Sequence, residues 1–195
     1  FKKQAERFGT RIVTGDIMRC DFSRRPFELF PDEGAAIKAH AVIVATGGRT
    51  SMEGACKYHP MPIPGSAQRF VLDHEAALTA HRDLHGRVVI LDAVGHIEGI
   101  GLGELVAHAG CETTLVTPFP TPIELDAETA ALALRRAVRA GVRWRPTTVL
   151  AAIGDHQVTL VDGLSGTAET LTDVATVVIR THGVPEDALY HALRD

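Results

Sequence analysis

The segment from Asp92 to Gly99, with the sequence DAVGHIEG, combines residue types that can hold a phosphate group. Gly95 and Gly99 lie where a chain must reverse and let its backbone approach an anion closely. His96 lies between them, and we expect it either to contact a nucleotide or to fill the space that further glycines would leave. The spacing predicts a nucleotide at this turn, held by backbone N–H groups.

The turn differs from the G-x-G-x-x-G pattern that is typical of dinucleotide-binding turns. Asp92 stands where the first glycine is expected, and the loop is about two residues longer. The next apolar run ends in Val116, Thr117 and Pro118, without the acid that would bind the ribose of NAD or an arginine for the extra phosphate of NADP. Three alternatives remain: NAD(P) binding, binding of ADP or AMP alone, or a nucleotide-type fold kept for its packing.

The other residues that could do chemistry are scattered. His81 and His85 are four positions apart, but Asp83 and Gly86 favour a helix end over a metal site, and no third ligand has a suitable spacing. We therefore expect no bound metal. The three cysteines are Cys20, Cys56 and Cys111. Without C-x-x-C spacing they predict neither a redox pair nor a disulfide framework, and free thiols are typical of a cytoplasmic protein.

Composition narrows the function classes further. With 195 residues, 45% of them hydrophobic, the chain can bury a sizeable core. A net charge of −4 without a basic cluster argues against a nucleic-acid partner. No apolar run approaches the roughly 20 residues of a membrane span, so no membrane association is expected. Neither a G-x-S-x-G elbow nor a P-loop lysine motif is present.

A strand, a helix and a second strand are predicted around the turn. Val88–Leu91 is a short apolar run that suits a strand buried on both faces of a parallel sheet. Apolar residues from Leu102 to Ala109 recur at helical spacing, and Gly110 ends that helix. Thr113–Thr117 forms the next strand, so the segment predicts a βαβ unit.

A second helix is predicted at Ala127–Ala140, with Asp126 as its N-cap and Gly141 at its end. Its expected core face consists of Ala130, Leu134, Ala137 and Val138. The arginines around the other side are interpreted as a solvated face rather than a phosphate site.

Alternating segments follow that helix and predict a series of hairpins at Trp144–Val149, Gln157–Val161 and Thr167–Leu171. Val174–Ile179 then returns as a buried strand. The expected fold class is α/β, a Rossmann-like parallel sheet with helices on both faces plus a small antiparallel β-meander.

That meander is predicted near the amino terminus, after a helix at Phe1–Phe8. Strand candidates are Ile12–Val13, Asp16–Cys20, Pro26–Phe30 and a strand around Ile37. Ala41–Gly48 is predicted as a buried strand that ends in a glycine turn. Because the first helix has neither an initiating methionine nor a cap ahead of it, we expect a fragment of a longer protein.

The segments Lys2–Asp21 and Val42–Gly48, the latter reading VIVATGG, resemble the FAD domain of thioredoxin reductases. The resemblance implies that Ala45, Thr46 and Gly47 touch a flavin nucleotide. Residues 64–65 and 73–75 resemble the crossover to the NAD(P)H domain in that superfamily. Since the C-x-x-C pair is missing, disulfide reduction is not implied.

Val88–Thr117 resembles the corresponding unit of trimethylamine dehydrogenase and of flavin and iron–sulfur enzymes related to 2,4-dienoyl-CoA reductase. Pro185–Leu189, after the turn at Gly183, resembles a segment of the same superfamily. The resemblance implies the nucleotide-binding part of a flavin-dependent oxidoreductase, with FAD and NAD(P) or ADP as cofactors of the full-length protein. FMN and a 4Fe–4S cluster would belong to upstream domains, which would be this chain's partners.

The predicted divisions are a partial FAD domain at 1–50, a crossover linker at 51–85 and an NAD(P)-type or ADP-binding domain at 86–195. No catalytic side chain is expected, because the cofactors would carry the chemistry and the isolated chain would be inactive. The alternative is a structural module that binds ADP or AMP without redox activity. The predicted cofactor-binding residues are Ala45, Thr46, Gly47, Asp92, Gly95, His96, Gly99, Thr117 and Gly183.

Overall fold

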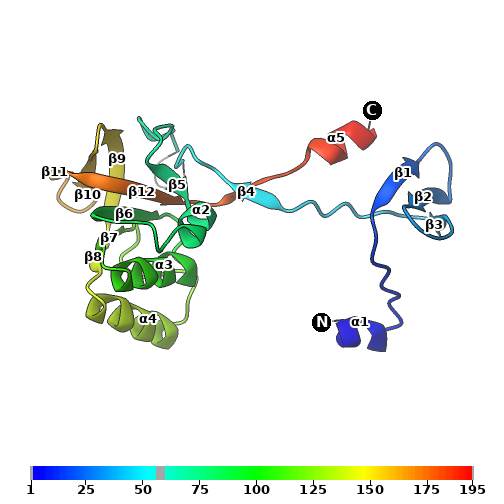
Figure 1. Ribbon diagram of the computed structural model, residues 1–195, viewed down its shortest axis with the longest axis horizontal. Helices are drawn as coiled ribbons and strands as arrows, with labels where there is room; N and C mark the ends of the chain where they lie inside the picture. Colours follow the sequence, from blue (N-terminus) through cyan, green and yellow to red (C-terminus); the bar gives the residue numbers. More distant parts are fainter. Residues whose placement is uncertain (1, 56–59, 195) are drawn as a thin grey trace. The chain divides into compact units, whose positions relative to one another are not determined.

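The computed structural model describes residues 2–55 and 60–194, which form two compact units (Figure 1). One unit comprises residues 1–46 together with 187–195, and the other comprises residues 47–186. These units follow the contacts of the chain and not the binding of cofactors. The functional division at residues 50 and 85 therefore stays a prediction.

The larger unit is built on a five-stranded sheet in the order β5-β12-β6-β7-β8. Its strands are β5 (Val71–Asp73), β12 (Val174–Arg180), β6 (Arg87–Asp92), β7 (Glu112–Val116) and β8 (Arg143–Arg145). Every neighbouring pair is parallel. The carboxyl ends of all these strands consequently meet at one edge of the sheet, where open α/β sheets bind their ligands.

Helices cover one face of this sheet, and a second sheet covers the other (Figure 1). The helices are α2 (His74–Thr79), α3 (Ile97–His108) and α4 (Ala127–Arg139). The second sheet is antiparallel, in the order β11-β10-β9. Its strands are β9 (Thr148–Gly154), β10 (Gln157–Asp162) and β11 (Ala168–Leu171). The α/β Rossmann-like fold is thus confirmed, but the predicted helices on both faces are corrected, because the antiparallel sheet covers the second face in the described residues.

Strand β6 shows why its sequence is apolar without alternation. Val88 and Ile90 pack into the core beneath the helices, whereas Val89 and Leu91 pack into the core beneath the antiparallel sheet. All four side chains are at most 4% exposed. A strand that is buried on both faces needs apolar residues at every position.

The hairpin series begins later than predicted. Trp144 belongs to β8 of the parallel sheet, and the first hairpin strand starts at Thr148. Pro146 lies between the two strands and has no N–H to donate, and Thr147 adopts a φ of 47° in the left-handed region. This break separates β8 from β9, which the alternating pattern predicts as a single strand.

The predicted core face of α4 is also corrected. Ala130, Ala133 and Ala137 are the buried residues of that helix, Leu134 is partly buried, and Val138 is 52% exposed. Three and four residues separate the buried alanines, so they share one face, and Val138 is turned about 100° away from Ala137.

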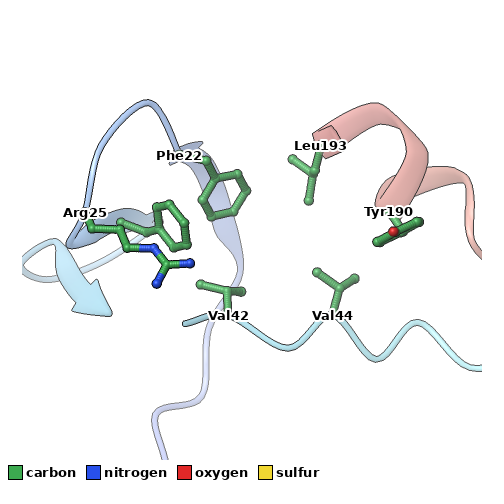
Figure 2. A pocket seen from close by; sticks show the side chains of 7 residues that line it. Phe22, Arg25, Val42, Val44, Tyr190 and Leu193 are labelled. Carbon is green, nitrogen blue, oxygen red and sulfur yellow. The ribbon is translucent and has the colours of Figure 1, made fainter. Parts of the chain in front are cut away.

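The smaller unit contains α1 (Lys2–Arg7) and an antiparallel sheet of β1 (Ile17–Asp21), β2 (Phe27–Pro31) and β3 (Ile37–Ala39). The predicted meander is confirmed, but residues 12–13 form no strand. The unit also includes α5 (Ala188–Arg194). A pocket of about 600 Å³ opens within it, and Figure 2 shows Phe22, Arg25, Tyr190 and Leu193 among the side chains that line it.

The predicted buried strand at Ala41–Gly48 is wrong. Residues 41–47 form neither helix nor strand, and the Ile43 side chain is 92% exposed. Among the described residues no strand pairs with this segment, and an extended backbone joins a sheet only through hydrogen bonds to its neighbours. The short strand β4 (Gly48–Thr50) begins where the prediction ended and pairs with β13 (Gly183–Pro185).

Within residues 2–55 and 60–194, no helix is both long and apolar enough to cross a membrane.

Candidate nucleotide-binding site

The predicted turn lies at the carboxyl edge of the parallel sheet. Strand β6 ends at Asp92, and α3 begins at Ile97. Gly95 has a φ of 78°, in the left-handed region that other residues rarely adopt. The predicted strand, turn and helix are therefore confirmed as a βα unit of the Rossmann-like sheet.

The carboxylate of Asp92 fastens this turn from inside. Its side chain is 3% exposed, and its Oδ1 accepts hydrogen bonds from the backbone N–H groups of Val94 at 3.0 Å and Gly95 at 2.9 Å. Burial raises the pKa of Asp92, although these N–H donors and the nearby Arg180 partly oppose the rise. Two N–H groups of the turn are thus satisfied by the chain itself.

Gly99 is required because it packs against Asp92. A Cβ at position 99 would lie 2.7 Å from both Cγ and Oδ2 of Asp92, closer than any real contact. Gly101 has no neighbour within 4 Å of such a Cβ, and Gly103 would meet only ordinary contacts from 3.7 Å outward. Of the three glycines in α3, only Gly99 is enforced by its surroundings.

The amino terminus of α3 has no side-chain cap. His96 is the N-cap residue, but its ring makes no capping hydrogen bond. The other helices on this face differ, since Asp73 caps α2 by accepting from Ala76 N–H at 2.7 Å and Asp126 caps α4 by accepting from Thr129 N–H at 2.9 Å. An uncapped helix start leaves backbone donors and the positive end of the helix dipole for an anion.

Charged side chains gather at this helix start. His96 Nδ1 lies 2.5 Å from Glu98 Oε2, and the Arg180 guanidinium lies 3.6 Å from Glu98 Oε1. Partial burial raises the pKa of Glu98, but its own N–H, His96 and Arg180 outweigh this and hold the pKa below its usual range. Glu98 is therefore a carboxylate at neutral pH, beside groups that could bind a phosphate.

The sequence analysis did not identify Arg180 as a site residue. Arg180 is the last residue of β12 and pairs in register with Asp92 across the sheet. Its side chain is 18% exposed and donates to the carbonyl oxygen of Thr181 at 2.8 Å. The predicted strand ended at Ile179, one residue before Arg180. The parallel register with β6 would have placed Arg180 beside Asp92 at this edge of the sheet.

Thr117 follows β7 at the same edge of the sheet. It is 5% exposed, and its hydroxyl oxygen accepts from Phe119 N–H at 3.4 Å. The loop that follows folds against the turn, since Glu124 N–H donates to the Gly95 carbonyl at 3.0 Å. A Cβ on Gly95 would come within 3.0 Å of Phe119 and Ile123 side chains. Thr117 is therefore buried beneath this loop and is not exposed as a ribose contact would require.

The remaining predicted residues lie elsewhere. Gly47 adopts a φ of 74° just before β4. Gly183 begins β13 and pairs with Thr50, at the opposite end of β4 from Gly47. Ala45 and Thr46 are exposed and belong to the smaller unit. The structure thus brings together Asp92, Gly95, His96 and Gly99, with Thr117 on the neighbouring strand.

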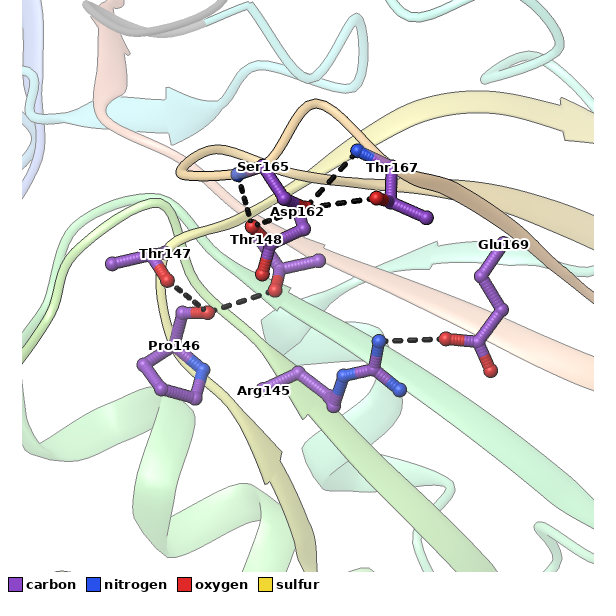
Figure 3. Close-up of polar contacts among 8 residues, drawn as sticks. All are labelled: Arg145, Pro146, Thr147, Thr148, Asp162, Ser165, Thr167 and Glu169. Carbon is purple, nitrogen blue, oxygen red and sulfur yellow. Dashed lines mark hydrogen bonds and ion pairs between the residues drawn. The ribbon is translucent and has the colours of Figure 1, made fainter.

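A polar network at the end of β8 serves the packing of the two sheets. The Arg145 guanidinium lies 2.6 Å from the Glu169 carboxylate of β11, an ion pair drawn as a dashed line in Figure 3. Asp162 Oδ1 accepts from Leu164 and Ser165 in the loop of the next hairpin. Arg145 also accepts from Thr117 N–H through its carbonyl at 3.0 Å. It is the arginine nearest along the sheet to the expected ribose position, but its charge is paired.

Among the described residues, the histidines and cysteines form no metal-binding cluster. His81 and His85 both follow the end of α2 at Thr79, and their Nδ1 atoms contact backbone carbonyls. Across the described part of the chain, no group of three His, Cys, Asp or Glu side chains is placed to hold a metal ion. Cys20 and Cys111 are free, and Cys56 lies outside the described residues.

The sequence model of the pyridine nucleotide-disulphide oxidoreductases matches residues 3–193. The chain belongs to this family. Its members bind FAD and NAD(P) as dinucleotide cofactors. Thioredoxin reductase 1 of Arabidopsis thaliana, a mitochondrial protein, is 57% identical over 47 residues, which are 24% of this chain and 12% of that protein.

Solved structures extend the likeness over more of the chain. The 6-hydroxypseudooxynicotine amine oxidase of Pseudomonas geniculata N1 is 31% identical with a TM-score of 0.73, over 80% of this chain and 24% of that one. Histamine dehydrogenase from Rhizobium sp. 4-9 has the same fold, with 22% identity and a TM-score of 0.70 over 77% of this chain and 24% of its own. The chain thus spans about a quarter of the length of these enzymes.

Proposed function

We propose that this chain is the nucleotide-binding part of a flavin-dependent oxidoreductase and that residues 47–186 bind an adenine nucleotide at the β6–α3 turn. The uncapped start of α3, at the carboxyl edge of the parallel sheet, is the observation that carries this proposal. Gly95 supplies the tight turn, and His96 and Arg180 lie beside it as partners for phosphate oxygens.

The likeness at 31% identity to an amine oxidase supports a proposal for the type of oxidoreductase. Together with the turn that resembles trimethylamine dehydrogenase, it supports a carboxyl-terminal nucleotide-binding part of such an enzyme. FMN and a 4Fe–4S cluster would be held by other domains of the full-length protein.

FAD fits the described residues only in part. Gly47, with its positive φ, can bring backbone close to a nucleotide, as the resemblance to the ATG turn implies. A second requirement is a helix amino terminus for the diphosphate. Within residues 2–55 and 60–194, the β6–α3 turn alone joins a parallel strand through a positive-φ glycine to a helix of more than two turns. We therefore expect the chain by itself to bind no flavin tightly.

When bound, a flavin or nicotinamide would supply the hydride or electron transfer. The residues of this chain would bind and orient the nucleotide. Backbone N–H groups at the start of α3 would hold phosphate, and Asp92 would keep the turn rigid through its hydrogen bonds to residues 94 and 95. No catalytic side chain is assigned.

A structural ADP or AMP module is the second candidate. The buried Thr117 and the loop that contacts Gly95 favour it, because they leave no polar group at the end of β7 for a selective ribose contact. A short nucleotide anchored by its phosphates needs less of that edge than a dinucleotide does.

Calorimetric titration of the purified chain with ADP tests the proposal, alongside an absorbance spectrum. We expect saturable ADP binding and a colourless protein. Absence of ADP binding up to millimolar concentrations would refute the proposed site. Stoichiometric flavin released on denaturation would contradict the expectation that this chain alone holds no FAD.

A further inference from the structure

The carboxylate of Glu98 contacts the charged side chains that lie beside the start of α3. Glu98 is the second residue of the helix. Its carboxylate lies 2.5 Å from His96 Nδ1 and 3.6 Å from the Arg180 guanidinium. An anion of the chain itself thus engages the groups that would attract an anionic ligand.

The guanidinium of Arg180 retains a hydrogen-bond donor that has no partner among the described residues. Its guanidinium donates to Thr181 and approaches Glu98, but its Nε is buried and has no hydrogen-bond partner in the described structure. The positive charge of Arg180 also lowers the pKa of Asp92, which burial raises. Glu98 is the carboxylate that lies within ion-pair distance of Arg180, so a phosphate must compete with Glu98 for this guanidinium.

We propose that Glu98 is the residue that sets the charge selectivity of the nucleotide site, by competing with ligand phosphate for His96, Arg180 and the start of α3. This inference rests on the proposed function. Glu98 is 36% exposed, so its carboxylate can be displaced, whereas Asp92 is 3% exposed and stays in the turn. The site accordingly takes nucleotides weakly, and it penalises each additional phosphate charge that comes near Glu98.

Substituting Glu98→Gln tests this role. Glutamine keeps the shape and an oxygen acceptor for the helix N–H but removes the charge. We expect ADP to bind about tenfold more tightly to E98Q than to the unmodified chain, equivalent to about 1.4 kcal/mol. AMP should gain less, and adenosine, which has no phosphate, should gain nothing.

Glu104→Gln provides the matched control. Glu104 lies on the same helix, but its carboxylate pairs with Arg136 at 2.7 Å and not with the residues of the turn. Its removal should leave the affinities for ADP, AMP and adenosine unchanged. Thermal melts of both variants would confirm that each is folded.

The outcomes separate the two proposals. If the unmodified chain binds ADP and E98Q binds it no more tightly, the role of Glu98 is refuted and the nucleotide site stands. An equal gain for adenosine and ADP would also overturn the inference, because the effect would then not be electrostatic. If neither protein binds ADP, the proposed function and the inference both fail.

Discussion

The helices α3 and α4 each follow a strand of the same parallel sheet, and they begin in opposite ways. Asp126 caps α4 with its own carboxylate, accepting a hydrogen bond from Thr129 N–H. At α3 the N-cap residue is His96, which turns its ring toward Glu98 and caps nothing. A helix start that is capped by its own side chain is stabilised by that cap. The start of α3 has no such cap and lies at the sheet edge where open α/β sheets bind anions.

The two helices also differ in composition. Alanines fill the buried face of α4, whereas α3 carries glycines at positions 99, 101 and 103. Each interior glycine costs about 1 kcal/mol of helix stability relative to alanine. Only Gly99 has a neighbour, Asp92, that forbids a larger residue. The sequence of α3 is therefore shaped in part by the turn before it.

The largest effect is expected from Gly99→Val. A Cβ at 2.7 Å from Asp92 must displace the carboxylate that fastens the turn, and overpacking of this kind costs about 1–3 kcal/mol. ADP binding should be lost, and the melting temperature should fall. Calorimetry and a thermal melt would measure both effects.

Gly101→Ala is the matched control for that variant. Nothing lies within 4 Å of the added Cβ, so alanine should raise the free energy of unfolding by about 0.5–1 kcal/mol through helix propensity alone. ADP affinity should be unchanged. A folded G99V protein with normal ADP affinity would move the nucleotide site elsewhere.

Smaller changes in melting temperature are expected when the charge of Asp92 or Asp126 is removed. The two changes should have opposite signs. The pKa of Asp92 is raised above the ordinary 3.8 by burial. Its protonated form therefore favours folding, and that contribution is complete below about pH 3.8 and is lost as pH rises through the folded pKa. Asp92→Asn should raise the melting temperature at pH 7 relative to the unmodified chain, and the gain should vanish near pH 4.

Asp126→Asn should behave in the reverse manner. Hydrogen bonds at Thr129 lower the pKa of Asp126 below 3.8, so its contribution is present above that value and is lost as pH falls through the folded pKa. D126N should therefore lower the melting temperature at pH 7 and have little effect in strong acid. Melting curves with the same pH dependence for both variants would contradict the distinction between the two helix starts.

The smallest difference is expected between NADH and NADPH. Thr117 is buried and provides no charge that could repel or attract the extra phosphate, and the Arg145 guanidinium is paired with Glu169. Affinities for the two should differ less than tenfold, which corresponds to about 1.4 kcal/mol. A larger preference in parallel titrations would show that Arg145 or another charged residue leaves its present partner to select the ligand.

Local patterns were sufficient to predict much of the larger unit. The apolar run of β6, the glycine end of α3 and the Asp126 cap each depend on neighbours in sequence, and each is confirmed. The strand prediction for residues 41–47 was wrong, because apolar composition cannot reveal whether partner strands are present. Arg180 and Glu98 could not be joined from sequence, because parallel register, set by strands far apart in the chain, brings them together.

The most direct test of the central claim is an ADP titration followed by amide chemical shifts. Binding at the β6–α3 turn predicts that the backbone N–H signals of residues 95–99 shift together and saturate, while those at the start of α4, from Asp126 to Thr129, stay in place. Saturable shifts centred on α4 or on the smaller unit, with residues 95–99 unmoved, would contradict the account.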